Sequence, residues 1–160
     1  MRRRGFLTLA TGVAACGYRP LRAGLAGHPK IRVASAVARI PSAHALGEEV
    51  ATGARAELAR NGALASDGVP LRIEIVRFEE LGEGDEVVAG SPIARGVRVR
   101  LVARGAIEGG DFETDDQEAT EVVASGGGVL AFDAARAGAA RGAARRAGAL
   151  VARAVLGLPG

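Results

Sequence analysis

The chain has 160 residues, with 21 basic and 18 acidic side chains and a formal net charge of +3. Aromatic residues make up only 3% of it and tryptophan is absent, which disfavours the aromatic stacking platforms that bind single-stranded nucleic acid. Three of the arginines lie within the first four residues, and removing these three leaves equal numbers of basic and acidic residues. The positive charge is therefore no evidence for nucleic-acid binding.

Residues 1–15 have the pattern of a bacterial export signal. Three arginines precede a short apolar run that ends at Ala15, and small residues lead up to Cys16. A membrane-spanning helix needs about 20 apolar residues, so this segment is too short to span. The stretch from Arg3 to Leu7 resembles a twin-arginine export motif. Because an arginine-rich chain acquires such pairs easily, ordinary secretion stays an equal alternative.

Cys16 is the only cysteine of the chain. The run Val13-Ala14-Ala15-Cys16 resembles the lipobox of bacterial lipoproteins, in which fatty acids such as palmitate are attached to the cysteine after the signal is removed. Several acyl chains on one residue give durable anchoring. A buried structural thiol and an intermolecular disulfide are the alternatives, but neither explains a thiol directly behind such a leader. We therefore predict that Cys16 is lipidated.

The first predicted elements of the folded part are a strand and a helix. The stretch from Lys30 to Ile40 alternates as a strand does, and Ile31, Val33, Ser35, Val37 and Arg39 share one side, which predicts a strand with one mostly buried face. A helix is predicted to follow Pro41 and to continue to about Arg60. Its apolar residues recur every four positions: Leu46, Val50, Ala54 and Leu58. Asn61-Gly62 is a typical helix end.

Three further strands and a second helix are predicted. Leu71–Phe78 alternates and shifts phase at Val76, which indicates a bulge. The acidic stretch Glu79–Glu86 is predicted to be a solvated hairpin loop, and the next strand is Val97–Arg104. A second acidic run, Asp111–Glu118, is predicted to be a long turn before a weaker strand over Ala119–Ala124.

The last predicted element is a long helix rich in alanine and arginine. Asp133 is predicted to be its N-cap, and the helix continues to about Leu156. One of its sides carries the small and apolar residues Ala140, Ala143, Ala147, Leu150, Val151, Ala154, Val155 and Leu158.

Together these elements predict the organisation of the chain. We expect a signal peptide over residues 1–15, a lipidated tether over residues 16–29 and a single α+β domain over residues 30–160. In the order β-α-β-β-β-α, two helices would pack on one face of a mostly antiparallel four-stranded sheet.

The sequence offers few groups for catalysis or metal binding. The only histidines are His28 and His44, and no cluster of cysteine and histidine has metal-ligand spacing. The glycine-rich segments match neither a dinucleotide fingerprint nor a phosphate-binding loop, and no serine lies in a nucleophile elbow. We therefore expect a protein that is not an enzyme and that has no metal and no cofactor.

Arg98, Arg100 and Arg104 are the candidate ligand-binding residues. In an extended strand they share one side, opposite Val99 and Leu101, and alternate residues lie about 7 Å apart. The planar guanidinium group suits phosphate and carboxylate ligands, so the row is a candidate phosphate site. The alternative is the solvated face of an edge strand that charge protects from association.

The six residues from Cys16 to Leu21 (CGYRPL) resemble the start of the mature lipopolysaccharide-assembly outer-membrane lipoproteins (LptE-like), in which a lipidated Cys-Gly-aromatic run is common. The order of the predicted elements, including the helix end from Glu57 to Gly62, is also similar to that family. The resemblance spans nearly the whole mature chain. Gly17 after the cysteine is compatible with sorting to the outer membrane.

This resemblance implies a lipoprotein at the periplasmic face of the outer membrane. Members of the family sit as a plug inside a large β-barrel translocon and help to deliver lipopolysaccharide to the cell surface. The row formed by Arg98, Arg100 and Arg104 would then contact lipid phosphates. A generic cell-envelope lipoprotein that binds or scaffolds another partner is the second hypothesis. An exported enzyme is the third, and it rests only on the twin-arginine resemblance.

Overall fold

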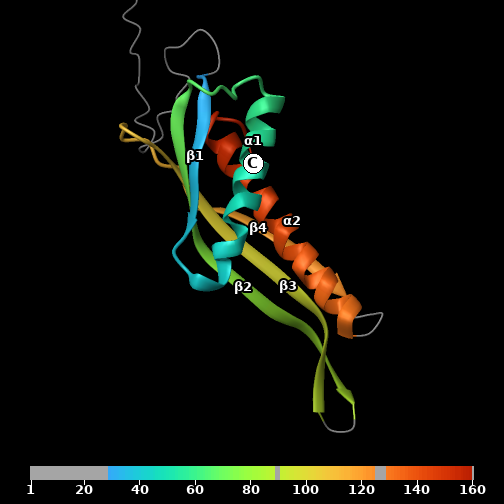
Figure 1. Cartoon of the computed structure of the whole chain (residues 1–160). Helices are drawn as coiled ribbons and strands as arrows, with labels where there is room; N and C mark the ends of the chain where they lie inside the picture. The colour runs from blue at the N-terminus through green and yellow to red at the C-terminus, as the bar shows by residue number, and fades with distance from the viewer. Residues whose placement is uncertain (1–28, 89–90, 125–128, 160) are drawn as a thin grey trace, which may run out of the picture.

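The computed structural model describes residues 29–88, 91–124 and 129–159. These residues form a four-stranded sheet with two helices on one face (Figure 1). This confirms the predicted α+β class and its element order. The elements are β1 (Ile31–Ala38), the short 3-10 helix η1 (Pro41–Leu46), α1 (Gly47–Arg60), β2 (Val69–Val88), β3 (Ser91–Ile107), β4 (Gln117–Ala124) and α2 (Val129–Val155).

The strands lie in the sheet in chain order, β1-β2-β3-β4. β2 pairs antiparallel with β3, and β3 pairs antiparallel with β4, but β1 pairs parallel with β2. The parallel pair arises because α1 carries the chain back to the start of the sheet before β2 begins, as a crossover connection must. The sheet is therefore mostly antiparallel, as predicted, and mixed rather than fully antiparallel.

A bulge in β1 changes which of its residues are buried. The pairing register with β2 shifts between Val33 and Ser35, so Ala36 and Ala38 turn towards the core. Val37, predicted to lie on the buried face, is instead 45% exposed. The prediction was wrong at this residue because one extra residue in a strand reverses the side on which every later side chain lies.

The hairpin of β2 and β3 is much longer than predicted. The pairing continues without a loop from Leu71 opposite Ile107 to Val88 opposite Ser91. The prediction of a solvated loop over Glu79–Glu86 was therefore wrong. An acidic side chain is accommodated in this ladder where it forms a cross-strand charge pair, as Glu79 does opposite Arg100. The predicted bulge in β2 is confirmed, since the register shifts between Ile75 and Arg77.

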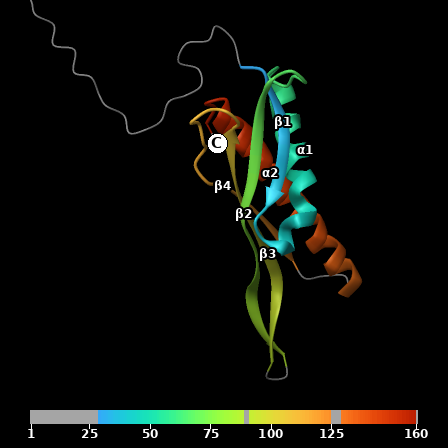
Figure 2. The ribbon, with the colours of Figure 1, turned by 60° about the vertical axis from the view of Figure 1, so that its left-hand side comes forward.

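The two helices form one layer over the sheet (Figures 1 and 2). The predicted apolar stripe is confirmed, because Leu46 at the end of η1 and Val50, Ala54 and Leu58 on α1 are all buried. On α2 the buried residues include the predicted Ala140, Ala143, Ala147, Val151 and Val155. The lower part of the β2–β3 hairpin extends beyond both helices (Figure 2).

The start of α2 differs from the prediction. The helix already includes Val129, so Asp133 is an exposed residue within its second turn and not the N-cap. Leucine and alanine are strong helix formers, and Leu130 and Ala131 therefore favour the earlier turn. This turn lies beyond the core, and Val129 and Leu130 are 77% and 87% exposed.

Glycines bring α1 and α2 into close contact. A Cβ atom on Gly53 would lie 1.9 Å from the carbonyl oxygen of Arg145, and one on Gly148 would lie 2.0 Å from that of Val50. Both distances are far below van der Waals contact, so only glycine fits where the backbones cross. The two glycines lower intrinsic helix propensity, and the close packing that they permit compensates for this.

We expect Gly53→Ala and Gly148→Ala each to lower the free energy of unfolding by about 3 kcal/mol or more, because the helices must separate to admit a methyl group. Gly138→Ala, on the same helix as Gly148, is the matched control, since its Cβ would meet no atom within 4 Å. It should raise stability by about 0.5–1 kcal/mol. Urea denaturation of the three variants measures these changes in the free energy of unfolding. Equal changes at all three sites would contradict the close-contact explanation.

Candidate functional site

The predicted arginine row lies on the face of the sheet opposite the helices, which we call the outer face. Val99, Leu101 and Ala103 point into the core and are fully buried. Arg98, Arg100 and Arg104 alternate with them and lie on the outer face, where Arg98 is exposed and the other two are partly buried. The predicted placement of the three residues in one row is confirmed. Their role as a phosphate site stays a prediction.

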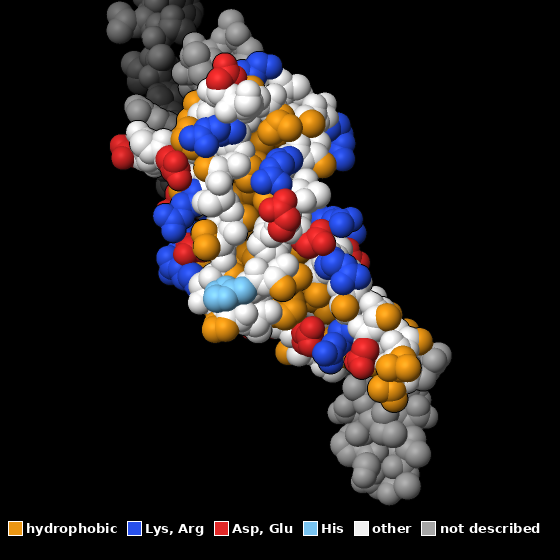
Figure 3. Space-filling model, viewed as in Figure 1, with side chains coloured by type: hydrophobic (Ala, Val, Ile, Leu, Met, Phe, Trp, Pro, Cys, Tyr) orange, Lys and Arg blue, Asp and Glu red, His pale blue; other side chains and the backbone are white. Residues whose placement is uncertain are grey.

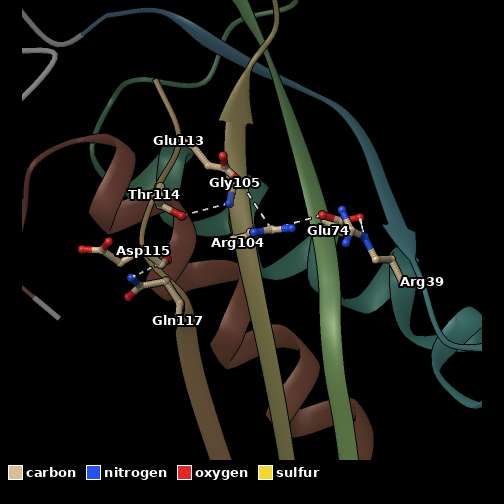
Figure 4. A network of polar contacts seen from close by, with 8 residues as sticks. All are labelled: Arg39, Glu74, Arg104, Gly105, Glu113, Thr114, Asp115 and Gln117. Atoms are coloured by element: carbon tan, nitrogen blue, oxygen red, sulfur yellow. Dashed lines mark hydrogen bonds and ion pairs between the residues drawn. The ribbon is translucent and has the colours of Figure 1, made fainter. Parts of the chain in front are cut away.

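Arg104 is held in an ion-pair network that crosses three strands (Figure 4). Its Nε atom donates to Oε2 of Glu74 on β2 at 3.1 Å and lies 3.3 Å from Oε1 of Glu113. The other carboxylate oxygen of Glu74 accepts a hydrogen bond from Arg39, which follows β1. Glu74 therefore joins Arg104 on β3 to Arg39, which directly follows β1.

The segment that carries Glu113 is fixed to β3 by a threonine. Thr114 is buried, its Oγ1 accepts the backbone N–H of Gly105 at 2.9 Å, and its own N–H donates to the carbonyl of Gly105 at 2.8 Å. An isolated bridge between Ala106 and Glu113 continues this pairing. The backbone thus places the Glu113 carboxylate beside Arg104 (Figure 4).

Charge compensation shifts the pKa of Glu74. Burial by itself would raise the pKa of this carboxyl, but the hydrogen bonds from Arg39 and Arg104 and their positive charges outweigh burial and lower it. The side chain of Glu74 is 23% exposed, so solvent screens the network only in part.

Arg100, which lies four residues before Arg104 on β3, has a comparable environment. It donates to Glu118 on β4 and lies 3.7 Å from Glu79 on β2. The hydrogen bond from Arg100 lowers the pKa of Glu118, and the same bond raises the pKa of Arg100. Within the described part of the chain, the Nε atom of Arg100 is buried and has no hydrogen-bond partner. The carboxylates of Glu118 on β4 and Glu79 on β2 nevertheless neutralise the charge of Arg100 from both neighbouring strands.

Arg98 lies between two exposed apolar side chains. In the register of the sheet it is opposite Leu81 on β2 and Val122 on β4. These residues are 48% and 58% exposed. In the register of the sheet, the neighbours of Arg98 on the outer face are therefore apolar, whereas Arg100 and Arg104 lie beside carboxylates.

The outer face has a shallow hollow of about 200 Å³ at the Glu74 network. It is lined by Arg39, Arg72, Glu74, Arg104, Gly105, Ala106 and Glu113. Arg72 has no ion pair or hydrogen bond from its side chain within the described residues, and neither has Arg32 on the adjacent strand. Sequence reasoning missed both residues because it examined one strand. The alternation of Arg72 with Leu71 and Ile73 was the available signal.

The helix-bearing side has interspersed charges of both signs (Figure 3). Ion pairs join its helices to their neighbours: Arg136 to Glu80, Arg145 to Glu49 and Arg146 to Glu121. Arg136 and Arg146 therefore join α2 to the sheet, and Arg145 joins it to α1.

Several predicted features lie outside the described residues. These are the export signal over residues 1–15, the lipidated Cys16 and nearly all of the tether over residues 16–29. In the described ranges, no three residues of histidine, cysteine, aspartate or glutamate are grouped so that they could hold a metal ion. Within the same ranges, none of the helices has both the length and the apolar character needed to cross a membrane.

Comparisons with known proteins give a distant structural likeness. No protein-family model matches the chain, and no curated protein matches it. Among solved structures, it is similar to a minor lipoprotein from Acinetobacter baumannii, with 11% sequence identity and a TM-score of 0.49. The match covers 81% of this chain and 94% of that one. A likeness of this degree identifies neither a family nor an activity.

The lowered pKa of Glu74 predicts a pH dependence of stability. A carboxyl whose pKa is lower in the folded state contributes stability above its ordinary value of 4.5, and this contribution is lost as the pH falls through the folded-state value. Glu74→Gln should cost about 1 kcal/mol of unfolding free energy at pH 7 and should flatten the loss of stability between about pH 5 and pH 3.

Glu108→Gln is the matched control, because Glu108 is an exposed residue with no side-chain ion pair within the described residues. Denaturant unfolding at several pH values compares the two variants with the natural chain. Parallel curves for Glu74→Gln and the natural chain would contradict the proposed linkage.

Proposed function

We propose that the protein is an outer-membrane lipoprotein that is not an enzyme, assembles with a β-barrel translocon and supports lipopolysaccharide transport to the cell surface. The observation that carries this proposal is Cys16, which directly follows an export-signal pattern and begins the run CGYRPL. Acylation of Cys16 would anchor the chain at the periplasmic face of the outer membrane. The tether of residues 16–29 would then connect the lipid to the domain.

The shape of the domain supports assembly with a hollow partner. The β2–β3 hairpin continues beyond the helix layer as a narrow two-stranded extension (Figure 2). An isolated two-stranded ribbon is marginally stable in water, so a surrounding partner would stabilise it. A barrel interior offers such surroundings for a narrow element.

Arginines on the outer face could contact lipid phosphates, and their existing ion pairs determine which of them would do so first. Arg100 and Arg104 already have carboxylate partners, so a phosphate must compete with Glu118 and Glu74 for them. A phosphate near Arg72 meets less competition, because the Arg72 side chain has no ion pair or hydrogen bond within the described residues. We therefore propose that Arg72 makes the first contact and that Arg98, Arg100 and Arg104 contribute after their own interactions rearrange.

The second candidate function is a generic cell-envelope lipoprotein that binds or scaffolds another partner. The carboxylates that neutralise Arg100 and Arg104 favour this alternative, since these two arginines already have partners without any lipid. The two functions share the lipid anchor and differ in the partner.

Purification in mild detergent distinguishes the two candidate functions. We expect the lipidated protein, isolated from its own membranes, to retain a large β-barrel protein in a fixed ratio, because enclosure would stabilise the hairpin extension. Recovery of the lipoprotein without any such barrel would contradict the first function. Mass spectrometry of the isolated complex measures both outcomes.

A Cys16→Ser variant separates anchoring from assembly. Without the thiol it should remain unacylated and leave the membrane fraction, while the folded domain keeps its helical circular-dichroism spectrum. If the Cys16→Ser variant stays in the membrane fraction in the absence of a partner, the prediction that Cys16 is lipidated is wrong.

Alanine substitutions on the outer face test the contact with lipid phosphates. Arg98→Ala and Arg72→Ala should each weaken lipopolysaccharide binding by about 3- to 10-fold, since each removes one charged contact. Arg141→Ala on the exposed face of α2 is the control for a change of net charge. Binding is measured with purified lipopolysaccharide at fixed salt. Equal affinities for the outer-face variants and the control would contradict this contact.

A further inference from the structure

The last strand of the sheet, β4, has an open edge. It pairs with β3 from Gly96 to Ala103, and no other strand lies on its far side among the described residues. Within the same part of the chain, no backbone hydrogen bond joins β4 to a segment other than β3. The helix α2 packs against its inner face, where Arg146 contacts Glu121 at 3.0 Å. An unpaired strand edge of this kind is a template for pairing with another chain.

The register of the sheet shows which backbone groups lie along this edge. The carbonyl of Gly105 accepts the N–H of Thr114 at 2.8 Å, so the backbone groups of Gly105 face the β4 side of β3. This direction alternates along a strand, so the other odd-numbered residues of β3 also face β4, and they lie opposite odd-numbered residues of β4. The N–H and C=O groups of Glu118, Thr120 and Val122 therefore face away from the sheet.

The side chains of β4 do little to protect this edge from pairing. The sequence of the strand, QEATEVVA, contains no proline and no lysine, the residues that most often block an edge. Both of its carboxylates are neutralised within the chain, Glu118 by Arg100 and Glu121 by Arg146. Val122 is 58% exposed on the outer face, more than any other large apolar side chain on the described strands.

We propose that the open edge of β4 pairs with the same edge of a second copy of this chain, antiparallel about a two-fold axis at Thr120. In this register Thr120 lies opposite Thr120 of the second copy, and threonine pairs are favourable across strands. Glu118 lies opposite Val122 of the second copy and Ala119 opposite Glu121, so no two like charges are directly opposite. The outward N–H and C=O groups of each copy then exchange hydrogen bonds with those of the other.

The composition of β4 favours this register over the other symmetric ones. An axis at Glu118 or at Glu121 would place a glutamate opposite itself, which destabilises a cross-strand pair. An axis at Ala119 or Val122 would leave more of the strand unpaired. The axis at Thr120 pairs every residue from Gln117 to Val123 and closes the assembly as a dimer, since each copy uses the same surface.

This surface is independent of the proposed transport function. β4 pairs with β3 only as far as Gly96, whereas the hairpin extension continues from there to Val88 opposite Ser91. A barrel that encloses the extension leaves the edge of β4 accessible. Dimer formation requires neither lipid nor a barrel, so the two proposals succeed or fail separately.

A glutamate at position 122 tests the charge arrangement of the dimer. The full chain carries Cys16→Ser in this experiment, so that acyl chains do not associate, and its mass is measured by size-exclusion chromatography with light scattering at several concentrations. We expect a concentration-dependent dimer that Val122→Glu weakens by about tenfold or more, because the axis creates the contact between like charges at Glu118 twice. Leu81→Glu is the matched control, since Leu81 is also exposed on the outer face and also lies opposite Arg98.

The outcomes of this comparison are distinct. A dimer that persists in Leu81→Glu and dissociates in Val122→Glu supports the proposal. A monomer at every concentration, or equal weakening by the two variants, would overturn it. Thermal unfolding of both variants shows whether they fold.

Single cysteines in the Cys16→Ser chain test the register. Opposite residues in a hydrogen-bonded antiparallel pair have Cα atoms about 5.5 Å apart, which suits a disulfide. Thr120→Cys should therefore form a covalent dimer on mild oxidation. The two copies of residue 122 would lie about 13 Å apart along the strands, beyond the reach of a disulfide, so Val122→Cys is the matched control. Equal crosslinking at both positions, or crosslinking at position 122 alone, would overturn the proposed pairing.

Two further measurements leave the charges of the edge unchanged. Hydrogen exchange of the amides of residues 118, 120 and 122 should be slower at concentrations that favour the dimer than after dilution, and a dimer without this protection would overturn the proposal. A photo-crosslinking amino acid at position 120, in cells, should give a product that contains two copies of this chain. A product that contains another protein would assign the edge to that protein and overturn the proposal.

Discussion

The contact between α1 and α2 at Gly53 and Gly148 is the constraint on which the rest of the domain depends. A core without tryptophan and with very few aromatic side chains must gain its packing from many short contacts between small residues. The helices can supply these only if their backbones approach closely, and the two glycines permit that approach. Alanines on α2, among them Ala143, Ala144 and Ala147, then fill the narrow space against the sheet.

Close packing of the helices also determines what they leave uncovered. A helix layer in which the backbones touch is narrow, and β2 and β3 extend past it. The inner side of the upper sheet is therefore apolar and fully buried, as Leu71, Ile73 and Ile75 show. Further along β2 the same side carries Glu80, whose carboxylate lies 3.6 Å from Arg136 on α2. The change from an apolar to a charged contact marks where the core ends.

The sequence was sufficient to predict those parts of the fold that depend on periodicity. The stripe of α1, the bulge at Val76 and the row of three arginines all follow from the spacing of apolar residues. The bulge in β1 could not be predicted, since every residue from Val33 to Val37 is small or apolar and either register gives an acceptable alternation. The length of β2 was missed for a different reason. A cluster of acidic residues resembles a loop until the opposite strand is known to carry Arg100.

The same limit applies to the candidate site. Periodicity placed Arg98, Arg100 and Arg104 on one face, because a single strand determines that relation. It could not show that Glu74 and Glu118 neutralise two of them, because these carboxylates come from the two neighbouring strands and depend on register. Whether a row of arginines is a binding surface or a structural ladder is decided by the strands beside it, and a single strand does not contain that information.

The acidic residues of β2 therefore stabilise the strand on both of its faces. Glu74 and Glu79 lie on the outer face and pair with arginines of β3, which holds β2 against β3. Glu80 lies on the inner side and pairs with Arg136, which joins β2 to α2 beyond the apolar core. Carboxylates thus continue the contacts of β2 where apolar side chains end.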